Sequence, residues 1–253
     1  MLRPRVIPCL LWKNGGLIKT RKFRNPVYVG DAINAIKIFN EKEVDELMIM
    51  DVEAGSKGRE PDYQMIREVA SECFMPLGYG GGIRNHGQIS KILSLGVEKI
   101  LLQTAAVEDE DFVKEAVRMM GSSTIVAVID YKINFWGKNK VMSHGASHGT
   151  SWSPIDFAKH MEQLGVGEII LQSVDRDGTM EGYDNELIRE VVKHVSIPVV
   201  CAGGAGQFSH IEEVLREAGP SGVAAGSMFV FQGRHRAVLI NYPTEKVNNL
   251  TIQ

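Results

Sequence analysis

Ile66-Arg67-Glu68-Val69 returns as Ile188-Arg189-Glu190-Val191, and this recurrence at a spacing of 122 residues decides the fold. At the same spacing, and without a gap, four further matches occur: Glu46 with Glu168, Asp62 with Asp184, Pro76 with Pro198, and Gly81-Gly82 with Gly203-Gly204. Solenoid repeats are roughly 20 to 50 residues long, so this period is not a solenoid unit. We interpret it as a duplication within a single domain spanning 1–253, with halves at about 1–122 and 123–240.

Short apolar, β-branched runs alternate with segments of helical periodicity across the whole repeat. The predicted strands are Val6–Leu11, Leu47–Val52, Met75–Tyr79, Ile100–Gln103, Thr124–Ile129, Glu168–Ser173, Ile197–Ala202 and Gly222–Ala225. The predicted helices are Ala32–Phe39, Tyr63–Cys73, His86–Leu95, Asp111–Met120, Pro154–Leu164, Glu186–His194 and Ser209–Glu217. Such alternation indicates parallel strands with crossover helices. Eight strands predict an α/β fold of the (β/α)8 TIM barrel type made of two half-barrels. A doubly wound open sheet is the alternative, but glycine clusters follow several strands, which favours the barrel.

Composition excludes several classes of protein. The chain has 253 residues, of which 44% are hydrophobic, and a net charge of −3. This balance argues against intrinsic disorder and against a dedicated nucleic-acid binder. No apolar run reaches the roughly 18 residues that a membrane helix needs, and the apolar stretch ended by Lys13 is too short for a secretory signal. The three cysteines are far apart and form no CxxC pair. We expect a cytoplasmic protein with no metal, no cofactor and no membrane or nucleic-acid partner.

Glycine-rich loops follow several of the predicted strands, at the barrel face that carries active sites. Glycine lets backbone N–H groups approach an anion, and the loops after the last two strands of such barrels often bind phosphate. The duplication supplies a related pair of loops in the first half. We therefore predict two phosphate cradles and an elongated bisphosphate ligand, although each cluster alone is compatible with an ordinary tight turn. The clusters are Gly80-Gly81-Gly82, Gln103-Thr104, Asp177-Gly178-Thr179, Gly203-Gly204-Ala205-Gly206 and Gly226-Ser227.

Asp130 ends the fifth predicted strand, so its side chain is expected at the catalytic face. Asp51 ends the second strand, and Asp177 follows the sixth. A lone aspartate at a strand end also serves as a helix cap, so position alone does not assign catalysis. Aligning the first and fifth strands matches Asp130 with Leu11, which cannot exchange a proton. The acid/base pair that the duplication would supply is therefore half missing.

Charged residues also precede four of the predicted strands, at the opposite end of the barrel. Two acids and two bases placed there predict a salt-bridged ring, with ordinary solvated loop charges as the alternative. The bottom face of such barrels usually serves stability. The four residues are Arg5, Glu46, Lys99 and Glu168.

These residues together resemble the cyclase subunit of imidazole glycerol phosphate synthase, the HisF family. The likeness runs from the N-terminus to about Phe231, and the Asp-Arg-Asp-Gly-Thr string is its most specific part. The matching strings are Val6-Ile7-Pro8-Cys9-Leu10, Gly80-Gly81-Gly82-Ile83, Thr104-Ala105-Ala106-Val107, Ser173-Val174-Asp175-Arg176-Asp177-Gly178-Thr179 and Gly203-Gly204-Ala205-Gly206.

The resemblance implies a (β/α)8 barrel with a HisH-like glutaminase docked on its bottom face. Ammonia from that glutaminase would pass a charged gate and the barrel interior to a phosphorylated small molecule at the top. The gate matches the four bottom residues, and Glu98 matches a position that contacts the glutaminase. Lys19, Asp51 and Asp130 match active-site positions, and Asp177 lies in the matched string. The implied phosphate-binding residues are Gly82, Gln103, Thr104, Gly178, Gly204, Gly226 and Ser227, with Gln103 replacing the family's asparagine.

Departures from the family pattern bear on the activity. The family's general acid on the first strand is an aspartate where this chain has Leu11, a loss typically worth on the order of 10²–10⁴ in rate. Residues 135–140 and 233–243 also differ from the histidine-pathway pattern. They resemble a paralogous branch of surface-polysaccharide pathways, in which the complex supplies ammonia to a third enzyme, a sugar amidotransferase that forms an acetamidino group.

Three functions remain open from the sequence. The first is ammonia supply for acetamidino-sugar formation in lipopolysaccharide or O-antigen biosynthesis. The second is the cyclase/lyase activity of imidazole glycerol phosphate synthase in histidine biosynthesis. The third is a non-catalytic scaffold and ammonia conduit. A single-chain sugar-phosphate isomerase is disfavoured, because it would also need an acid at Leu11 and would not need the gate.

Overall fold

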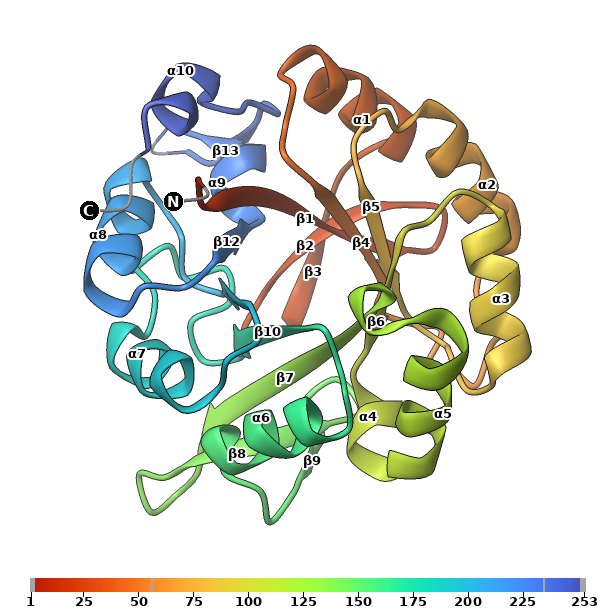
Figure 1. Cartoon of the computed structure of the whole chain (residues 1–253). Helices are drawn as coiled ribbons and strands as arrows, with labels where there is room; N and C mark the ends of the chain where they lie inside the picture. The colour runs from red at the N-terminus through yellow and green to blue at the C-terminus, as the bar shows by residue number, and fades with distance from the viewer. Residues whose placement is uncertain (1–2, 56, 234, 251–253) are drawn as a thin grey trace.

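Eight parallel strands close into a barrel in the computed structural model, which describes residues 3–55, 57–233 and 235–250 (Figure 1). Strand β12 pairs with β1, and β7 pairs with β10, so the ring of backbone hydrogen bonds is continuous. The predicted (β/α)8 barrel is confirmed. In order around the barrel, the strands are β1 (Arg5–Lys13), β4 (Leu47–Asp51), β5 (Leu77–Gly80), β6 (Lys99–Leu102), β7 (Ile125–Ile133), β10 (Glu168–Ser173), β11 (Val199–Ala202) and β12 (Gly222–Ala225).

Helices surround the barrel, and all seven predicted helices are present. They are α1 (Ala32–Glu41), α2 (Tyr63–Glu72), α3 (His86–Ser94), α5 (Glu110–Met120), α6 (Pro154–Gln163), α7 (Asn185–His194) and α8 (Phe208–Ala218). Shorter helical turns, which were not predicted, are α4 (Thr104–Glu108), η1 (Ser122–Thr124), α9 (Ser227–Val230) and α10 (Thr244–Asn248). None of the helices in the described ranges is both long and apolar enough to span a bilayer.

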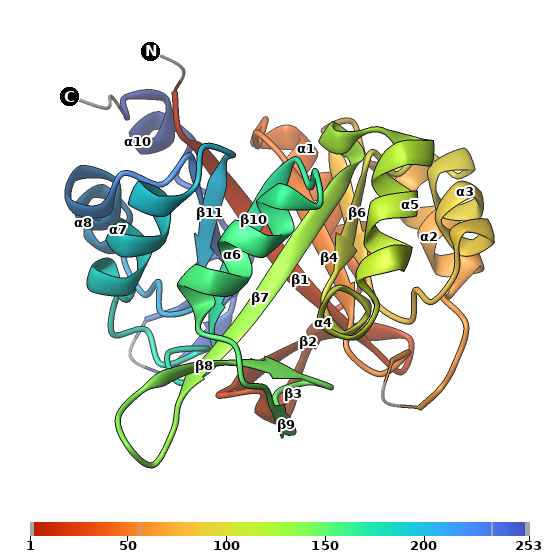
Figure 2. The same cartoon turned by 60° about the horizontal axis from the view of Figure 1, so that its bottom comes forward.

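Two hairpins that the sequence analysis did not predict lie at the end of the barrel where the parallel strands terminate (Figure 2). Strand β1 continues into β2 (Gly16–Arg21) and β3 (Arg24–Gly30), and β7 continues into β8 (Asn139–Ser143) and β9 (His148–Gly149). A further small hairpin joins β13 (Phe231–Gln232) to β14 (Ala237–Val238). We call the C-terminal end of the barrel, with the first two hairpins, the mouth.

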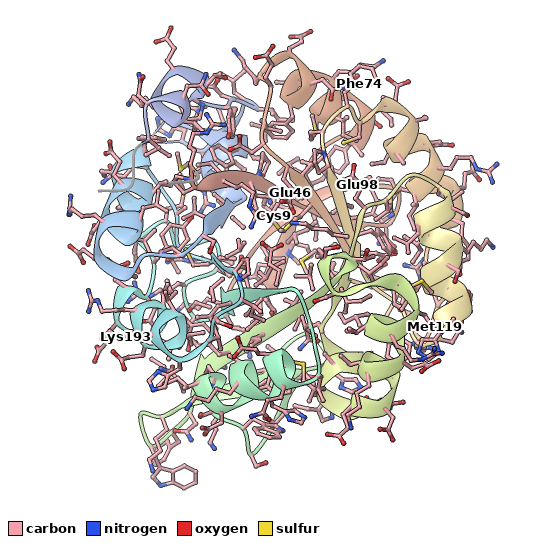
Figure 3. All side chains as sticks on the ribbon, in the orientation of Figure 1. Cys9, Glu46, Phe74, Glu98, Met119 and Lys193 are labelled. Atoms are coloured by element: carbon pink, nitrogen blue, oxygen red, sulfur yellow. The ribbon has the colours of Figure 1, made fainter. Side chains whose placement is uncertain are left out.

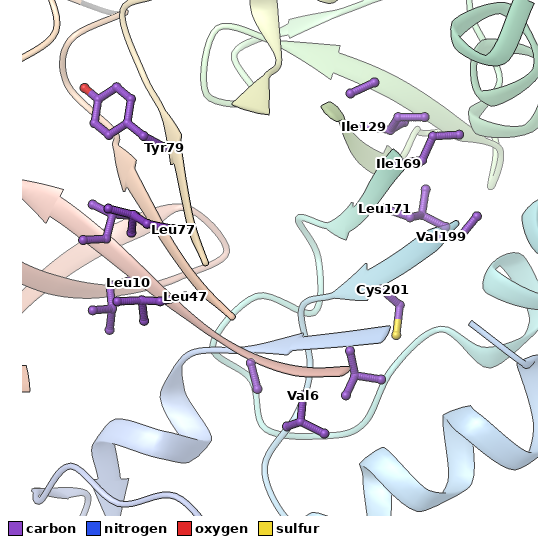
Figure 4. Close-up of a cluster of buried hydrophobic side chains, with 14 of the residues drawn as sticks. Val6, Leu10, Leu47, Leu77, Tyr79, Ile129, Ile169, Leu171, Val199 and Cys201 are labelled. Atoms are coloured by element: carbon purple, nitrogen blue, oxygen red, sulfur yellow. The ribbon is translucent and has the colours of Figure 1, made fainter. Parts of the chain in front are cut away.

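The barrel wall separates two apolar layers, because side chains of a strand alternate between its two faces. The outer layer packs strands against helices and includes Leu10, Leu47, Leu77 and Ile129 (Figure 4). The inner layer fills the barrel itself. Its buried members are Ile7, Met48, Leu101, Val126, Val128, Ile170, Val200, Ala202 and Ala224, with Cys9 and Met50 packed against them. Because the interior is filled by apolar side chains, we expect polar and charged groups at the two ends of the barrel.

The repeat spacing is visible in the elements. Helices α2 and α7 begin and end 122 residues apart, and so do strands β5 and β11. Asp62 and Asp184 cap the two helices in the same way, since each carboxylate accepts from the backbone N–H three residues on. Equal elements with equal caps are what a duplicated half-barrel would leave.

Candidate functional site

The four charged residues that precede barrel strands form a closed ring of ion pairs at the N-terminal end of the barrel. Arg5 contacts Glu46 at 2.5 Å and also pairs with Glu168. The Lys99 Nζ atom lies 2.9 Å from Glu46 and 2.7 Å from Glu168. Both carboxylates are buried and each meets both cations, so the structure brings together all four predicted residues. We call this set the basal ring.

Burial and pairing act in opposite directions on the basal ring. Burial lowers the pKa of the Arg5 guanidinium, but the hydrogen bonds and charges of Glu168 and Glu46 outweigh it and raise that pKa overall. Arg5 therefore stays a cation. The apolar side chains that fill the barrel lie directly inside the basal ring, so charged side chains meet apolar ones at this end of the barrel.

Exposed side chains surround the basal ring on the same face of the molecule. Figure 3 shows Glu46 toward the barrel centre, with Phe74 and Met119 farther out. Glu98, the predicted partner contact, is exposed just before β6. Phe74 is 85% exposed and Met119 is 49% exposed, although both are apolar. Singly exposed apolar side chains are common on protein surfaces, and the mouth hairpins carry them too, so the two residues alone do not define a binding surface.

At the mouth, Lys19 reaches from the first hairpin back across the top of β1. Its Nζ atom donates a hydrogen bond to the Cys9 carbonyl oxygen, and the side chain is 5% exposed. Burial lowers the pKa of the Lys19 ammonium, while the charges of Cys9 and Asp177 act to raise it. A side chain at Gly226 would place its Cβ 2.2 Å from this Nζ atom, so glycine there makes room for the lysine.

Asp177 fastens the first hairpin to the loop after β10. Its carboxylate accepts hydrogen bonds from the Thr20 hydroxyl at 2.7 Å and the Phe23 backbone N–H at 3.2 Å. Its backbone carbonyl accepts from the Lys22 N–H at 2.9 Å. Burial raises the pKa of Asp177, against the hydrogen bonds and the charge of Lys19. Asp177 thus orders the strand that carries Lys19.

Asp130 and Leu11 occupy corresponding places in the inward-facing rows of their strands. Val126 and Val128 point into the barrel, and Asp130 continues that row. Leu11 likewise follows Ile7 and Cys9 on β1. Burial, with a smaller contribution from the charge of Asp177, raises the pKa of Asp130 to about 8. Asp130 is therefore mostly protonated at pH 7. Leu11, the corresponding residue of the other half-barrel, has a side chain that cannot exchange a proton.

Asp51 lies apart from this cluster. Asp51 lies on the same face of β4 as Leu47 and Ile49, which pack against the helices, so it is not in the inward-facing row. One carboxylate oxygen accepts from the N–H groups of Glu53 and Ala54, each at 3.0 Å. Its nearest cation is Arg59, at 3.6 Å. Burial raises the pKa of Asp51, against these hydrogen bonds. The structure thus shows Asp51 as an anchor of the loop after β4, and the catalytic role expected for it stays a prediction.

The predicted phosphate-binding glycines lie in the loops at the mouth. Gly82 follows β5, Gly178 lies in the loop after β10, and Gly204 follows β11. A Cβ on Gly204 would lie 2.1 Å from the Gly182 carbonyl oxygen, so close backbone packing already requires glycine at that position. Close packing and anion binding are compatible, and the anion role of these loops stays a prediction.

Gln103 and Thr104 begin helix α4, and Gly226 and Ser227 begin α9 at the corresponding place in the second half. The Gln103 amide donates to the Met142 carbonyl at 2.7 Å. The Thr104 hydroxyl donates to the Gln103 side-chain oxygen, also at 2.7 Å. Gln103, which is longer than the family's asparagine, therefore binds the second hairpin. Its partner loop at Gly226 and Ser227 faces Lys19 instead.

Two contributors to the mouth were absent from the sequence predictions. Thr20 holds Asp177, and the Cys9 carbonyl holds Lys19. Neither group has a distinctive sequence signal, because a backbone carbonyl carries none and Thr20 lies in a hairpin that was not predicted. Within the described part of the chain, no group of three or more His, Cys, Asp or Glu side chains could hold a metal ion.

A parallel eight-stranded barrel with buried ionisable groups at its mouth is the architecture of the (β/α)8 enzymes. The family model described as "Histidine biosynthesis protein" matches residues 5–236. The chain is 49% identical to the "Putative imidazole glycerol phosphate synthase subunit hisF2" of Pseudomonas aeruginosa, over the full length of both chains. It is 45% identical to a putative HisF subunit of Leptospira interrogans, over 97% of each chain. It is 38% identical to the "Imidazole glycerol phosphate synthase subunit HisF" of Streptomyces coelicolor, over 91% of each. The chain belongs to the HisF family.

Proposed function

We propose that this chain is the synthase subunit of a glutamine amidotransferase complex and conducts ammonia through its barrel. A HisH-like glutaminase would dock on the face that carries Phe74, Glu98 and Met119. Ammonia would enter at the basal ring and travel along the apolar interior to the mouth. The closed basal ring carries this proposal, because four charges that satisfy one another at a barrel axis form a barrier that one side-chain movement can open.

The proposed use of the ammonia is acetamidino-sugar formation for lipopolysaccharide or O-antigen, in the cytoplasm, with a third enzyme as the sugar amidotransferase. One observation supports this choice over the cyclase reaction. Leu11 occupies the position that corresponds to Asp130 in the other half-barrel, so only one of two proton-transfer groups is present.

Imidazole glycerol phosphate synthase activity in histidine biosynthesis is the second candidate. The cluster of Lys19, Asp130 and Asp177 favours it, because a buried acid, a half-buried acid and a buried amine can still transfer protons. A scaffold that only conducts ammonia would need the basal ring but would not need this cluster.

The deciding experiment supplies the purified chain with an ammonium salt and with the ribulosyl bisphosphate intermediate that ammonia meets in the cyclase reaction of the HisF family. We expect turnover to imidazole glycerol phosphate near the uncatalysed background. The variant Leu11→Asp is expected to gain on the order of 10²-fold, because it restores a general acid. Robust turnover by the unaltered chain would exclude the amidination role and establish the cyclase.

A second experiment tests the amidination role directly by tracing the amide nitrogen of glutamine into the product. The complex receives glutamine labelled with ¹⁵N at the amide, together with unlabelled ammonium and the acceptor sugar with its amidotransferase. We expect the label in the acetamidino group despite the unlabelled ammonium. Product that carries the isotope ratio of the solution would show that the barrel does not conduct the ammonia.

A further inference from the structure

A cavity of about 390 Å³ lies at the mouth, between the turn of the first hairpin and the ends of β7 and β10. The hairpin contributes Arg21, Lys22 and Arg24, and the barrel contributes Lys132 and Asp175. None of these residues belongs to the basal ring or to the cluster around Lys19. Pockets of roughly 300–1,000 Å³ are the size that small-molecule ligands occupy.

Four cations and one carboxylate give this cavity a strong positive charge. No carboxylate of the described residues lies within ion-pair distance of Arg21, Lys22, Arg24 or Lys132. The one acid, Asp175, already accepts a hydrogen bond from the Ile133 backbone N–H at 2.9 Å. Arg21, Lys22 and Arg24 are exposed and Lys132 is half-buried, so water screens part of their repulsion, but four cations around one cavity still attract an anion.

The hairpin holds its cations in an unfavourable arrangement. Arg21 and Arg24 are directly paired across β2 and β3, and like charges in that position destabilise a hairpin. The turn residues Lys22 and Phe23 have φ angles of 55° and 60°. Two-residue turns of this kind favour Asn-Gly, because this backbone conformation is unfavourable for a residue with a side chain. Asp177 holds this turn through the N–H groups of Lys22 and Phe23.

We propose that this cavity is a binding site for the phosphate or diphosphate group of a phosphorylated small molecule. Arginine presents a planar fork of donors that matches phosphate oxygens, and lysine adds a point charge. The bound anion would neutralise the repulsion between Arg21 and Arg24 and join the hairpin to Lys132. The site adjoins the loop after β10 that carries Gly178, but its cations come from the hairpin and from β7. It does not depend on the ammonia-conducting role.

The test uses pyrophosphate as the probe and the full chain as the protein. Amine acetylation with a mass-spectrometric readout reports each lysine separately. Saturating pyrophosphate is expected to slow the acetylation of Lys22 and Lys132 about fivefold or more. Lys114 and Lys193, which lie on helices α5 and α7, are expected to react at unchanged rates. Sodium chloride at the same ionic strength corrects for screening.

Titration calorimetry of variants then measures which residues contribute to pyrophosphate binding. Arg24→Gln and Lys132→Gln are each expected to weaken pyrophosphate binding about tenfold, as loss of one charge-assisted contact would. Arg67→Gln removes the same charge from an exposed position on α2 and is expected to leave the affinity unchanged. Thermal melting confirms that each variant is folded.

Three results would overturn the proposal. One is protection of Lys22 and Lys132 by chloride as strong as that by pyrophosphate. Another is unchanged affinity in both Arg24→Gln and Lys132→Gln, which would place the pyrophosphate at the glycine loops. The third is no measurable binding. None of these results affects the nitrogen-tracing test of the ammonia route.

Discussion

At the scale of single residues, Lys99 is the member of the basal ring that meets both carboxylates from one atom. Replacing it by methionine keeps most of the volume but leaves Glu46 and Glu168 with Arg5 alone. Removing one partner from a buried ion pair leaves an uncompensated charge, so Lys99→Met is expected to lower the free energy of unfolding by about 3 kcal/mol. Urea denaturation measures this change.

The same variant tests the gate. With the glutaminase bound, Lys99→Met is expected to reduce the fraction of glutamine-derived ammonia that reaches the product. Lys114→Met is the matched control, because Lys114 forms a solvent-exposed pair with Glu110 on helix α5. Intact coupling in Lys99→Met would assign the basal ring to stability alone.

Asp130 gives a pH dependence of stability with a definite sign. Its pKa is about 8 in the folded protein, against about 4 for an unperturbed aspartate in the unfolded chain. Between these values the unfolded state loses a proton that the folded state keeps. The contribution of Asp130 is therefore fully present below about pH 4 and is lost as the pH rises toward 8.

Asp130→Asn removes this titration. The stability of the variant relative to the original chain is expected to rise between pH 5 and pH 8, by at most about 1.4 kcal/mol per pH unit, and then to level off. Urea unfolding at pH 5, 7 and 9 measures it. A difference that does not change with pH would mean that Asp130 titrates normally in the folded protein.

At the residue scale, the sequence was a good guide where charge interrupts an apolar pattern. The basal ring was predicted because each member directly precedes an apolar run, and a strand start fixes where such a side chain lies. The partners of Asp177 and Lys19 could not be predicted in this way. Their contacts join Thr20 to a loop 157 residues away and a lysine to a backbone carbonyl, and only the folded barrel brings these groups together.

At the scale of elements, helices α2 and α7 form a natural pair for comparison. Asp62→Ala is expected to cost about 1 kcal/mol, because it removes the helix cap alone. Asp184 caps α7 and also accepts a hydrogen bond from the buried Tyr131 hydroxyl at 3.2 Å. Asp184→Ala is therefore expected to cost about 2 kcal/mol in urea denaturation. Equal costs would show that the Tyr131 contact contributes nothing to stability.

Elements with a strong period were predicted well, and elements built at the mouth were not. Helix α7 shows its apolar face at helical spacing, and its predicted start differs by one residue from the observed one. The first hairpin lacks the Asn-Gly signal, since its turn is Lys22-Phe23, so its strands could not be recognised. Strand β7 runs on to Ile133, beyond the predicted end at Ile129, because β8 pairs with the extension.

At the scale of the whole molecule, we propose different tasks for the two ends of the barrel, and two exposed phenylalanines allow these tasks to be tested separately. Phe74→Ser changes the face around the basal ring, where the glutaminase is proposed to dock. It is expected to weaken that complex at least tenfold, as loss of an aromatic contact at a protein interface does. Phe135→Ser removes a side chain that is 96% exposed, against 85% for Phe74, from the second hairpin at the mouth.

Titration calorimetry with the glutaminase compares the two variants. Phe135→Ser is expected to bind as tightly as the original chain. Equal weakening by both variants, or by neither, would contradict the placement of the partner. The order of strands and helices, and hence the two faces, could be predicted from the alternation of apolar runs and helical segments, which the 122-residue repeat supports. The identity of the partner rests on the family.

The hydrocarbon filling of the barrel has a consequence for which chemical species can cross it. An ammonium ion would lose its hydration among Ile7, Val128 and Ala224 at a cost of many kcal/mol, whereas the uncharged base would lose only weak hydrogen bonds. If ammonia crosses the barrel as proposed, the apolar interior would therefore pass the uncharged base and exclude the ammonium ion. The nucleophile would then reach the mouth deprotonated, whatever the pH of the surrounding solution.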